Sequence, residues 1–305
     1  MRAVPLLAVA VALASAAPFA SAHAQQKVLL GHATTSTVSL KLFAAVGDIR
    51  VVGWDRDSVE LSGVVPTGVK AQLYAGAPDE HAKGLKMFVE SPTEQSGREG
   101  TLVLHVPRAA RVWLKTGSAD MDVTGVTGGL DLNVVGGSIT VHGNPKEVRA
   151  ESMDGNVIID GSPEWLRAKT ATGDITLHGG GDIGASTISG TIRTNGGDVE
   201  RAKLESTTGT LSFASVLTRN ASVELETHSG PIDIQLSLKS DADVDASTIT
   251  GAIDNQWTRT RPATGREGRG MTLQTSSGMG GAHIVVRSFK GTIQLRTSKL
   301  SLKGP

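Results

Sequence analysis

The sequence predicts an all-β protein, folded as a single-chain parallel β-solenoid (right-handed and β-helix-like) with coils of about 18–21 residues. Three observations predict this fold. A glycine recurs at nearly constant spacing, and apolar and polar residues alternate on either side of it. The composition also fits, because 37 glycines and only 3% aromatic residues suit thin coils filled by small aliphatic side chains.

The recurring glycine marks one structural corner in each coil. Successive steps between these glycines are 18, 18, 17, 19, 21 and 21 residues, Ala119 fills the slot one step earlier, and a last glycine fills it at the far end. We expect a positive φ, or the close approach of the next coil, to exclude a side chain at the corner. The predicted corner residues are Gly137, Gly155, Gly173, Gly190, Gly209, Gly230, Gly251 and Gly291.

Alternation around the glycine predicts two strands per coil. Positions seven before and two after the glycine are apolar, while the position six before it is mostly polar or charged, as at Asp131, Arg149 and Arg167. We expect the hydroxyl residues three before the glycine to bond backbone groups at the bend, or one another between coils. These residues are Thr116, Ser152, Thr170, Thr187, Ser206, Thr227 and Thr248.

The handedness follows from excluding one alternative. A left-handed hexapeptide helix would need an aliphatic residue one before the glycine, but Ser118, Gly136 and Asp154 occupy that position. A right-handed stack also agrees with the usual hand of parallel crossovers.

Three segments are predicted. Residues 1–24 are predicted to be a signal peptide, with Arg2 at the start, a short apolar run and Ala22-His23-Ala24 as a small-x-small cleavage site. Residues 25–111 hold a first coil plus a small N-terminal antiparallel β cap, whose strand-like runs are 59–65, 85–90 and 101–106. Residues 112–305 hold the repeat domain, with an arginine-bearing loop at 256–270 and a C-terminal edge strand.

Localisation follows from the leader and from what the chain lacks. The sequence has no cysteine, so it has neither a lipid-attachment cysteine nor a disulfide framework. No other run is long and apolar enough to span a bilayer after cleavage. We therefore expect an exported protein of the periplasm, the cell surface or the extracellular space.

Parts of the chain resemble a known family. The stretch from Gly47 to Asp55, the Thr-x-x-Gly-Asp-Ile-x-Leu unit at 170–177 and the closing Lys-Gly-x-Ile-x-Leu at 290–295 resemble the bacterial putative adhesin family, catalogued as a domain of unknown function. The resemblance covers roughly residues 38–295. It implies an exported β-solenoid with an adhesin-like role, and it brings no catalytic residues.

The predicted function is a non-enzymatic module of the cell envelope or surface. Thirty basic and thirty acidic residues give no excess charge, which argues against nucleic acid as a partner. The expected partner is an envelope protein or a glycan, and no cofactor is expected. Two alternatives stay open: a polysaccharide-active β-helix enzyme, and an envelope-stress or assembly factor.

The outward polar positions are predicted to form a solvated edge with no metal site, but several of them are candidates for one. His142, Asp160 and His178 follow the corner at equal distances and would stack as a ladder, although parallel neighbours on a flat sheet converge poorly on one ion. Stacked carboxylates are expected for Glu205 with Glu226 and for Asp233 with Asp254, and a third acidic cluster is Asp241, Asp243 and Asp245. Bound calcium would relieve their repulsion.

Two further groups are candidates for polymer chemistry. An enzyme could recruit only the outward residues Asp174, Arg193, Asp233 and Asp254, which are spread over four coils. Exposed indoles at Trp113, Trp165 and Trp257 could form a sugar-stacking platform or cover the flank of the stack. The loop arginines Arg259, Arg261, Arg266 and Arg269 could contact an acidic glycan or lipid, or simply be solvated.

Overall fold

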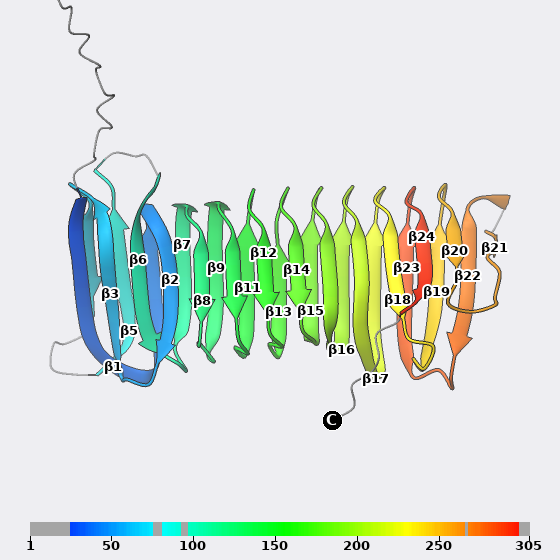
Figure 1. Ribbon diagram of the computed structural model, residues 1–305, viewed down its shortest axis with the longest axis horizontal. Coiled ribbons are helices and arrows are strands. Elements are labelled where there is room, and N and C mark those ends of the chain that lie inside the picture. The colour runs from blue at the N-terminus through cyan, green and yellow to red at the C-terminus, as the bar shows by residue number, and fades with distance from the viewer. Residues whose placement is uncertain (1–24, 76–80, 93–96, 266–267, 299–305) are drawn as a thin grey trace, which may run out of the picture.

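The computed structural model is an elongated all-β rod (Figure 1). It describes residues 25–75, 81–92, 97–265 and 268–298, so the predicted signal peptide lies outside the described residues. Within these ranges 24 strands form one mixed sheet. No helix in the described part of the chain has the length and apolar character to cross a membrane.

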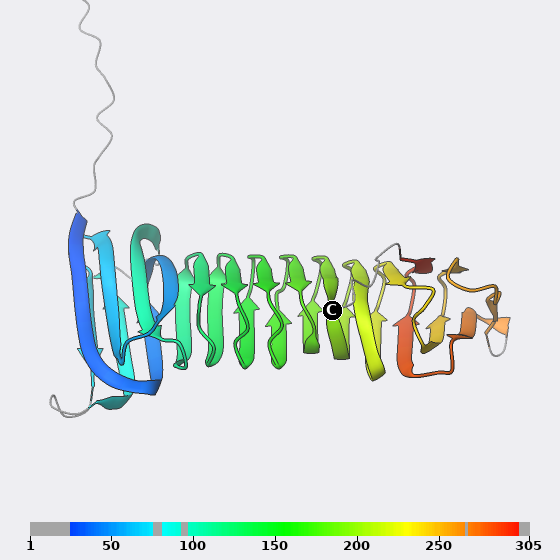
Figure 2. The same cartoon turned by 60° about the horizontal axis from the view of Figure 1, so that its bottom comes forward.

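Most strands belong to two ribbons whose neighbours pair in parallel, seen as two layers in Figure 2. The first ribbon, which precedes the corners, has this spatial order: β5 (Ala82–Glu90), β1 (Gln25–Ala44), β7 (Arg111–Ser118), β9 (Gly129–Gly136), β11 (Glu147–Ser152), β13 (Trp165–Lys169), β15 (Gly181–Thr187), β16 (Ile192–Ser206), β17 (Leu211–Thr227), β23 (Ala282–Ser288) and β19 (Ala242–Thr248).

The second ribbon follows the corners and repeats that order. It comprises β6 (Gly97–Pro107), β2 (Val46–Trp54), β8 (Met121–Thr124), β10 (Ile139–His142), β12 (Val157–Asp160), β14 (Ile175–His178), β16, β17, β18 (Ile232–Leu236), β24 (Ile293–Thr297) and β20 (Ile253–Asn255). Strands β16 and β17 belong to both ribbons, because each continues round the side of the rod.

The core lies between the ribbons and follows the alternation of each strand. Val157 pairs with Ile139 on one side and with Ile175 on the other, so equivalent residues of successive repeats stack in rows. All three are fully buried, and each such side chain contributes about 1.5–3 kcal/mol by leaving water.

Backbone contact fixes the corners. A Cβ on Gly155 would lie 1.7 Å from the carbonyl oxygen of Gly137, and one on Gly173 would lie 2.0 Å from that of Gly155. Among the eight predicted corner glycines only Gly137 has a positive φ (151°). Close approach of the neighbouring coil therefore excludes a side chain here, rather than an unusual backbone conformation.

The hydroxyl residues three before the corner hold the bends from Ser152 onward. The N–H of Gly155 donates to Ser152 Oγ at 2.9 Å, and Ser152 Oγ donates to the carbonyl of Gly137 at 2.8 Å. Thr170 makes the same two bonds in the next coil, to the Gly173 N–H and the Gly155 carbonyl, both at 3.1 Å. These bonds confirm the prediction for the column from Ser152 onward. Thr116 is the exception, because its buried Oγ1 has no hydrogen-bond partner within the described residues.

The N-terminal end differs from a purely antiparallel cap. Strand β3 (Ser58–Pro66) pairs antiparallel with β1 and β6, and β4 (Lys70–Tyr74) pairs antiparallel with β5. Strands β5 and β6, however, pair in parallel with β1 and β2. Their apolar residues keep the same rows, since Leu85 lies opposite Leu40, so they add one more coil beyond the first.

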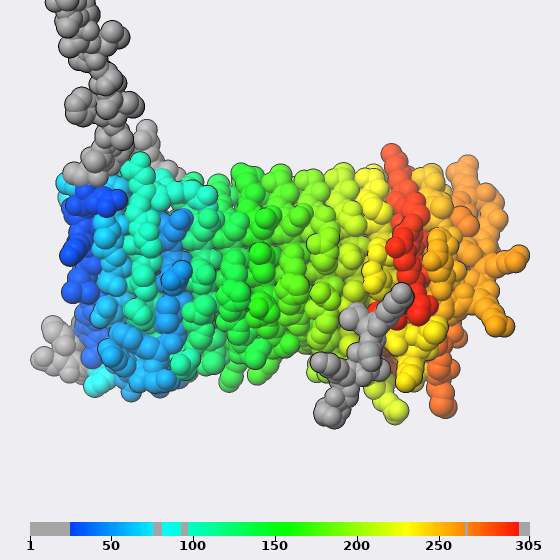
Figure 3. Space-filling view, in the orientation of Figure 1, coloured from blue at the N-terminus to red at the C-terminus, as the bar shows by residue number. Residues whose placement is uncertain are grey.

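At the C-terminal end the coils do not stack in the order in which they follow one another along the chain, contrary to expectation. The segment carrying β23 and β24 does not follow the coil of β19 and β20 but lies between it and the coil of β17 and β18. Figure 3 shows this red segment between yellow ones. Antiparallel β22 (Met271–Ser277) pairs with β19 and with the short β21 (Ala263–Thr264). Residues 299–305, expected to form the edge, lie outside the described residues.

Replacing Gly190 by Ala tests the corner contact. The added Cβ would lie 1.9 Å from the Gly173 carbonyl oxygen, so we expect a loss of about 1–3 kcal/mol in the free energy of unfolding, measured by urea denaturation. The matched control is Gly84→Ala, whose nearest neighbour would be the Ser39 oxygen at 3.9 Å, and we expect it to change stability by less than about 0.5 kcal/mol. Equal effects of the two changes would contradict the corner contact.

A pair of cysteines tests the inserted coil, since the chain has no cysteine of its own. Val285 lies opposite Glu224 on one side and Asp245 on the other. Glu224→Cys with Val285→Cys places the two Cα atoms about 4.8 Å apart and should form a disulfide on mild oxidation. The double variant Glu224→Cys with Asp245→Cys separates the two Cα atoms by two strand spacings, about 9.6 Å, and should form no disulfide. Intact-mass measurement distinguishes them, and the reverse result would mean that coils stack in chain order.

Candidate functional site

A row of mostly apolar side chains stands exposed along the corners. These residues lie two before each corner position, and we call them the corner row: Val135, Met153, Ala171, Ile188, Thr207, His228, Phe289 and Ile249 in spatial order. Met153 and Ile188 are 55% and 57% exposed, and the rings of His228 and Phe289 stack at 5.0 Å. Contiguous exposed apolar surface of this kind marks interaction sites.

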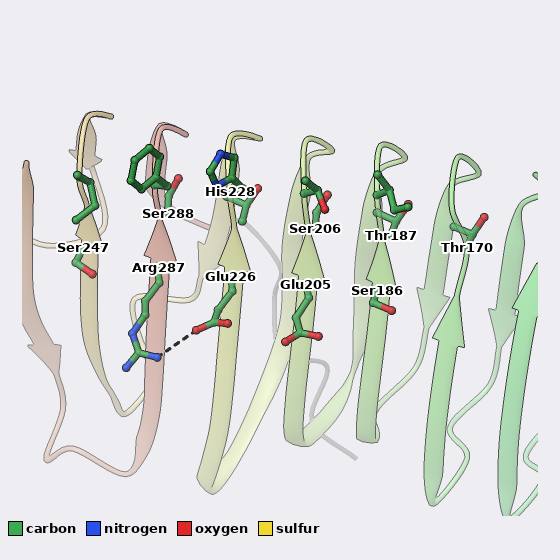
Figure 4. A pocket seen from close by; sticks show the side chains of 15 residues that line it. Thr170, Ser186, Thr187, Glu205, Ser206, Glu226, His228, Ser247, Arg287 and Ser288 are labelled. Atoms are coloured by element: carbon green, nitrogen blue, oxygen red, sulfur yellow. Dashed lines mark hydrogen bonds and ion pairs between the residues drawn. The ribbon is translucent and has the colours of Figure 1, made fainter. Parts of the chain in front are cut away.

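A second, polar row runs beside it on the outer face of the first ribbon. Its residues lie four before the corner and pair in register from strand to strand: Lys115, Asn133, Glu151, Lys169, Ser186, Glu205, Glu226, Arg287 and Ser247. Figure 4 shows part of this row on the strands, below residues of the turns.

Two neighbouring hollows lie between the two rows. One open hollow of about 660 Å³ runs past Glu205, Glu226 and Arg287, and another of about 380 Å³ runs past Lys115 and Lys169. Both are lined by Thr170 and Ile188, so they lie next to each other, and we call the two together the corner groove. One bank is apolar and the other is charged.

The charged side chains on this side of the groove form ion pairs with neighbouring side chains. Glu205 lies opposite Glu226, as predicted, and inserted β23 places Arg287 on the far side of Glu226. Arg287 Nη1 lies 3.1 Å from Glu226 Oε1 and Lys203 Nζ lies 3.0 Å from Glu205 Oε1. The hydrogen bond and the charge of Glu205 raise the pKa of Lys203. Basic side chains thus offset the stacked carboxylates.

The other predicted acidic stack is wrong. Asp233 and Asp254 do not lie side by side, because β24 is inserted between them and Gln294 is the neighbour of both. Arg296 of the same strand lies 3.5 Å from Asp233. The expectation assumed that coils stack in chain order.

The third acidic cluster has backbone partners. Asp241 Oδ1 accepts hydrogen bonds from the N–H groups of Met279 and Gly281, at 2.6 and 3.1 Å. Asp241 therefore holds the tight turn that leads into β23.

The predicted histidine ladder lies in register on the second ribbon. Asp160 pairs with His142 on one side and with His178 on the other. His142 Nδ1 lies 3.4 Å from Asp160 Oδ2, and all three side chains are exposed. No group of three or more His, Cys, Asp or Glu residues in the described part of the chain has the geometry to hold a metal ion.

The four residues considered for a catalytic site do not form one cluster. Asp174 accepts a hydrogen bond from the N–H of Thr191 in the next coil, at 2.7 Å. It belongs to a ladder in which Asp120 accepts from Ser138 N–H and Asn156 accepts from Asp174 N–H, at 2.8 and 2.9 Å. Arg193 is exposed on β16, and Asp233 and Asp254 are separated by β24.

The three tryptophans separate into two kinds. Trp257 is 3% exposed and its Nε1–H donates to the carbonyl of Ser237 at 3.1 Å, so it belongs to the core and not to an exposed platform. Trp113 and Trp165 lie on the outer face of the first ribbon. Of the loop arginines, Arg259, Arg261 and Arg269 are exposed, while Arg266 lies outside the described residues.

The corner row is the feature that our sequence reasoning missed. Its residues lie in the outward phase of the period-two pattern, where polar residues are expected, yet Val135, Met153 and Ile188 are apolar. The sequence did contain a signal for this row, because apolar residues at positions that should face solvent are unusual.

Comparisons with known proteins give structural likeness only. No family model matches the chain, and no curated protein matches it. Three crystal structures align with 90% of the chain: a putative adhesin from Bacteroides fragilis (11% identity, TM-score 0.44, 99% of that chain), a putative lipid binding protein from Parabacteroides distasonis (11%, 0.34, 97%) and a putative cell adhesion protein from Clostridium sporogenes (10%, 0.23, 100%).

Replacing Arg287 by Met tests the pairing of the charged bank. Without the guanidinium, Glu205 and Glu226 repel, so the free energy of unfolding should fall by about 1 kcal/mol in low salt and by less in 1 M NaCl. Arg193→Met is the control, because Arg193 has no ion pair within the described residues. If Arg287→Met were neutral and calcium raised the melting temperature of the wild type, the carboxylates would instead form a cation site.

Proposed function

We propose that this protein is an exported, non-enzymatic interaction module of the cell envelope or surface, adhesin-like in its mode of action. Its architecture would be a right-handed parallel β-solenoid, and its partner would lie along the corner groove. The observation that carries the proposal is the corner row, a mostly apolar bank eight coils long that no described part of the chain covers.

The groove suits an elongated partner rather than a compact one. Its charged bank is built from stacked strands and its apolar bank from the stacked turns that follow them, so each coil adds one equivalent position along the axis of the rod. Strand pairing holds the charged bank, and backbone hydrogen bonds between successive turns hold the corner row, as from the Ile188 N–H to the Ala171 carbonyl at 3.1 Å. Binding would therefore require little rearrangement. Rigid sites lose less conformational entropy on binding than flexible ones.

A binding role is favoured over a catalytic one by how the acidic groups are used. Glu205 and Glu226 have basic partners, while Asp174 and Asp241 hold backbone N–H groups. Hydrolysis of a glycan would need two carboxyl groups at a set separation across one bond. Export rests on the sequence pattern of residues 1–24.

Binding to isolated envelopes of the source cell tests this function. The double variant Ile188→Ser and Phe289→Ser removes two exposed side chains of the corner row, each able to contribute about 1.5–3 kcal/mol when buried by a partner. We expect envelope binding to weaken by at least about tenfold, which corresponds to 1.4 kcal/mol.

The matched control is Ile158→Ser, which removes an outward aliphatic residue of β12 on the other ribbon. Circular dichroism should show all variants folded with similar melting temperatures. Equal binding by wild type and double variant would contradict the groove as the site. Release of soluble fragments from the envelopes would contradict the non-enzymatic role.

A further inference from the structure

A second hollow lies at the opposite end of the same strands, away from the corner groove. It has a volume of about 320 Å³ and is bordered by Trp113 of β7 and Trp165 of β13. Between the two indoles it is lined by Asp131 of β9 and by Glu147 and Arg149 of β11. The strands that carry the two indoles are three steps apart in the ribbon, a span of about 14 Å.

Each indole is supported on one side by the protein. Trp113 packs against Phe43 with ring centroids 4.7 Å apart, and Phe43 stacks on Phe88 at 5.0 Å. The guanidinium carbon of Arg167 lies 4.7 Å from the ring centroid of Trp165. These contacts fix the orientation of both rings while leaving them on the border of the hollow.

The indole N–H groups distinguish these residues from the other two tryptophans. Trp54 and Trp257 donate to the carbonyls of Ser58 and Ser237, at 2.8 and 3.1 Å. Trp113 and Trp165 have no acceptor for their Nε1–H groups within the described residues. Tryptophan N–H groups usually have an acceptor where the ring is buried, so these two partly exposed indoles keep their donors available to water or to a ligand.

The charges of the hollow balance. Arg111 Nη2 lies 3.5 Å from Glu147 Oε2, and Arg149 Nη2 lies 2.9 Å from Glu151 Oε1. Asp131 accepts from the side-chain amide of Asn133 at 2.6 Å. Both basic groups therefore have acidic partners, and the site has no excess positive charge for a sulfate, phosphate or uronate group.

We propose that this hollow binds a neutral oligosaccharide built of hexose units. The apolar face of a pyranose ring fits the flat surface of an indole, and its hydroxyls are both donors and acceptors. Paired carboxylates and guanidinium groups, such as Glu147 with Arg111, offer both kinds of partner to hydroxyl groups. Two indoles three strands apart would contact different sugar rings of one chain, so affinity should grow with the number of linked sugars.

Titration with defined hexasaccharides tests the site. The probes are cellohexaose, laminarihexaose, maltohexaose, mannohexaose and chitohexaose as neutral chains, and hexagalacturonate as an anionic chain. Binding is followed by intrinsic tryptophan fluorescence and by calorimetry on the purified wild-type chain. We expect at least one neutral hexasaccharide to bind, its disaccharide to bind at least about tenfold more weakly, and hexagalacturonate not to compete.

Single substitutions locate the binding. Trp113→Ala and Trp165→Ala should each weaken binding by at least about fivefold, and Trp165→Phe should restore part of the loss because it keeps an aromatic face. Trp165 is 37% exposed, so its removal should leave the melting temperature nearly unchanged even if Trp113→Ala destabilises the aromatic contacts. Leu238→Ala is the control, since Leu238 is an exposed apolar residue that lies outside both the hollow and the Phe88–Phe43–Trp113 stack.

Two outcomes would overturn the proposal. Either no neutral hexasaccharide binds at millimolar concentration, or binding occurs but is unaffected by Trp165→Ala. Preferential binding of hexagalacturonate would likewise contradict the charge argument. The corner-groove variant Ile188→Ser with Phe289→Ser should bind the hexasaccharide normally, so failure here is distinguishable from failure of the proposed function.

Discussion

Direct backbone contact between neighbouring coils at the corners determines the rest of the rod. Because the Gly137 carbonyl lies where a Cβ of Gly155 would be, the next coil leaves no room for a side chain there. The same contact buries polar backbone groups, and Ser152 and its equivalents satisfy them. Side chains just before the corner then point outward, which is why the corner row stands free along one edge.

Both ends of the rod depart from chain order in the same way. At one end β1 and β2, the first described strands, lie between two later coils, and at the other β23 and β24, the last, lie between two earlier ones. An inserted segment is paired on both sides, so neither end of the described chain forms an open edge. The second insertion also brings Arg287 to the stacked carboxylates Glu205 and Glu226.

The repeat itself was readable from the sequence, because residues 18 positions apart in the central coils are neighbours in space. Corner glycines, hydroxyl column and apolar rows all follow from that one spacing. Stacking order at the C-terminal end was not readable, because Gly291 fits equally well after Gly251 or between Gly230 and Gly251. Repeats whose glycine, hydroxyl and apolar positions match can pair with one another in any order, so the sequence pattern does not fix which repeat lies beside which. The burial of Trp257 depends on a loop that carries no such period.

The inserted C-terminal coil has a consequence for how the polypeptide matures. During synthesis from the N-terminus, residues 242–255 appear before residues 282–297, although they lie farther out in the finished rod. Coil-by-coil growth from the N-terminal side therefore cannot complete this end. Residues 242–255 must stay unpaired on their inner side until residues 282–297 have been made, or must first pair with another strand and then release it, before they reach their final position. Assembly of this tip thus reports that synthesis has passed residue 297.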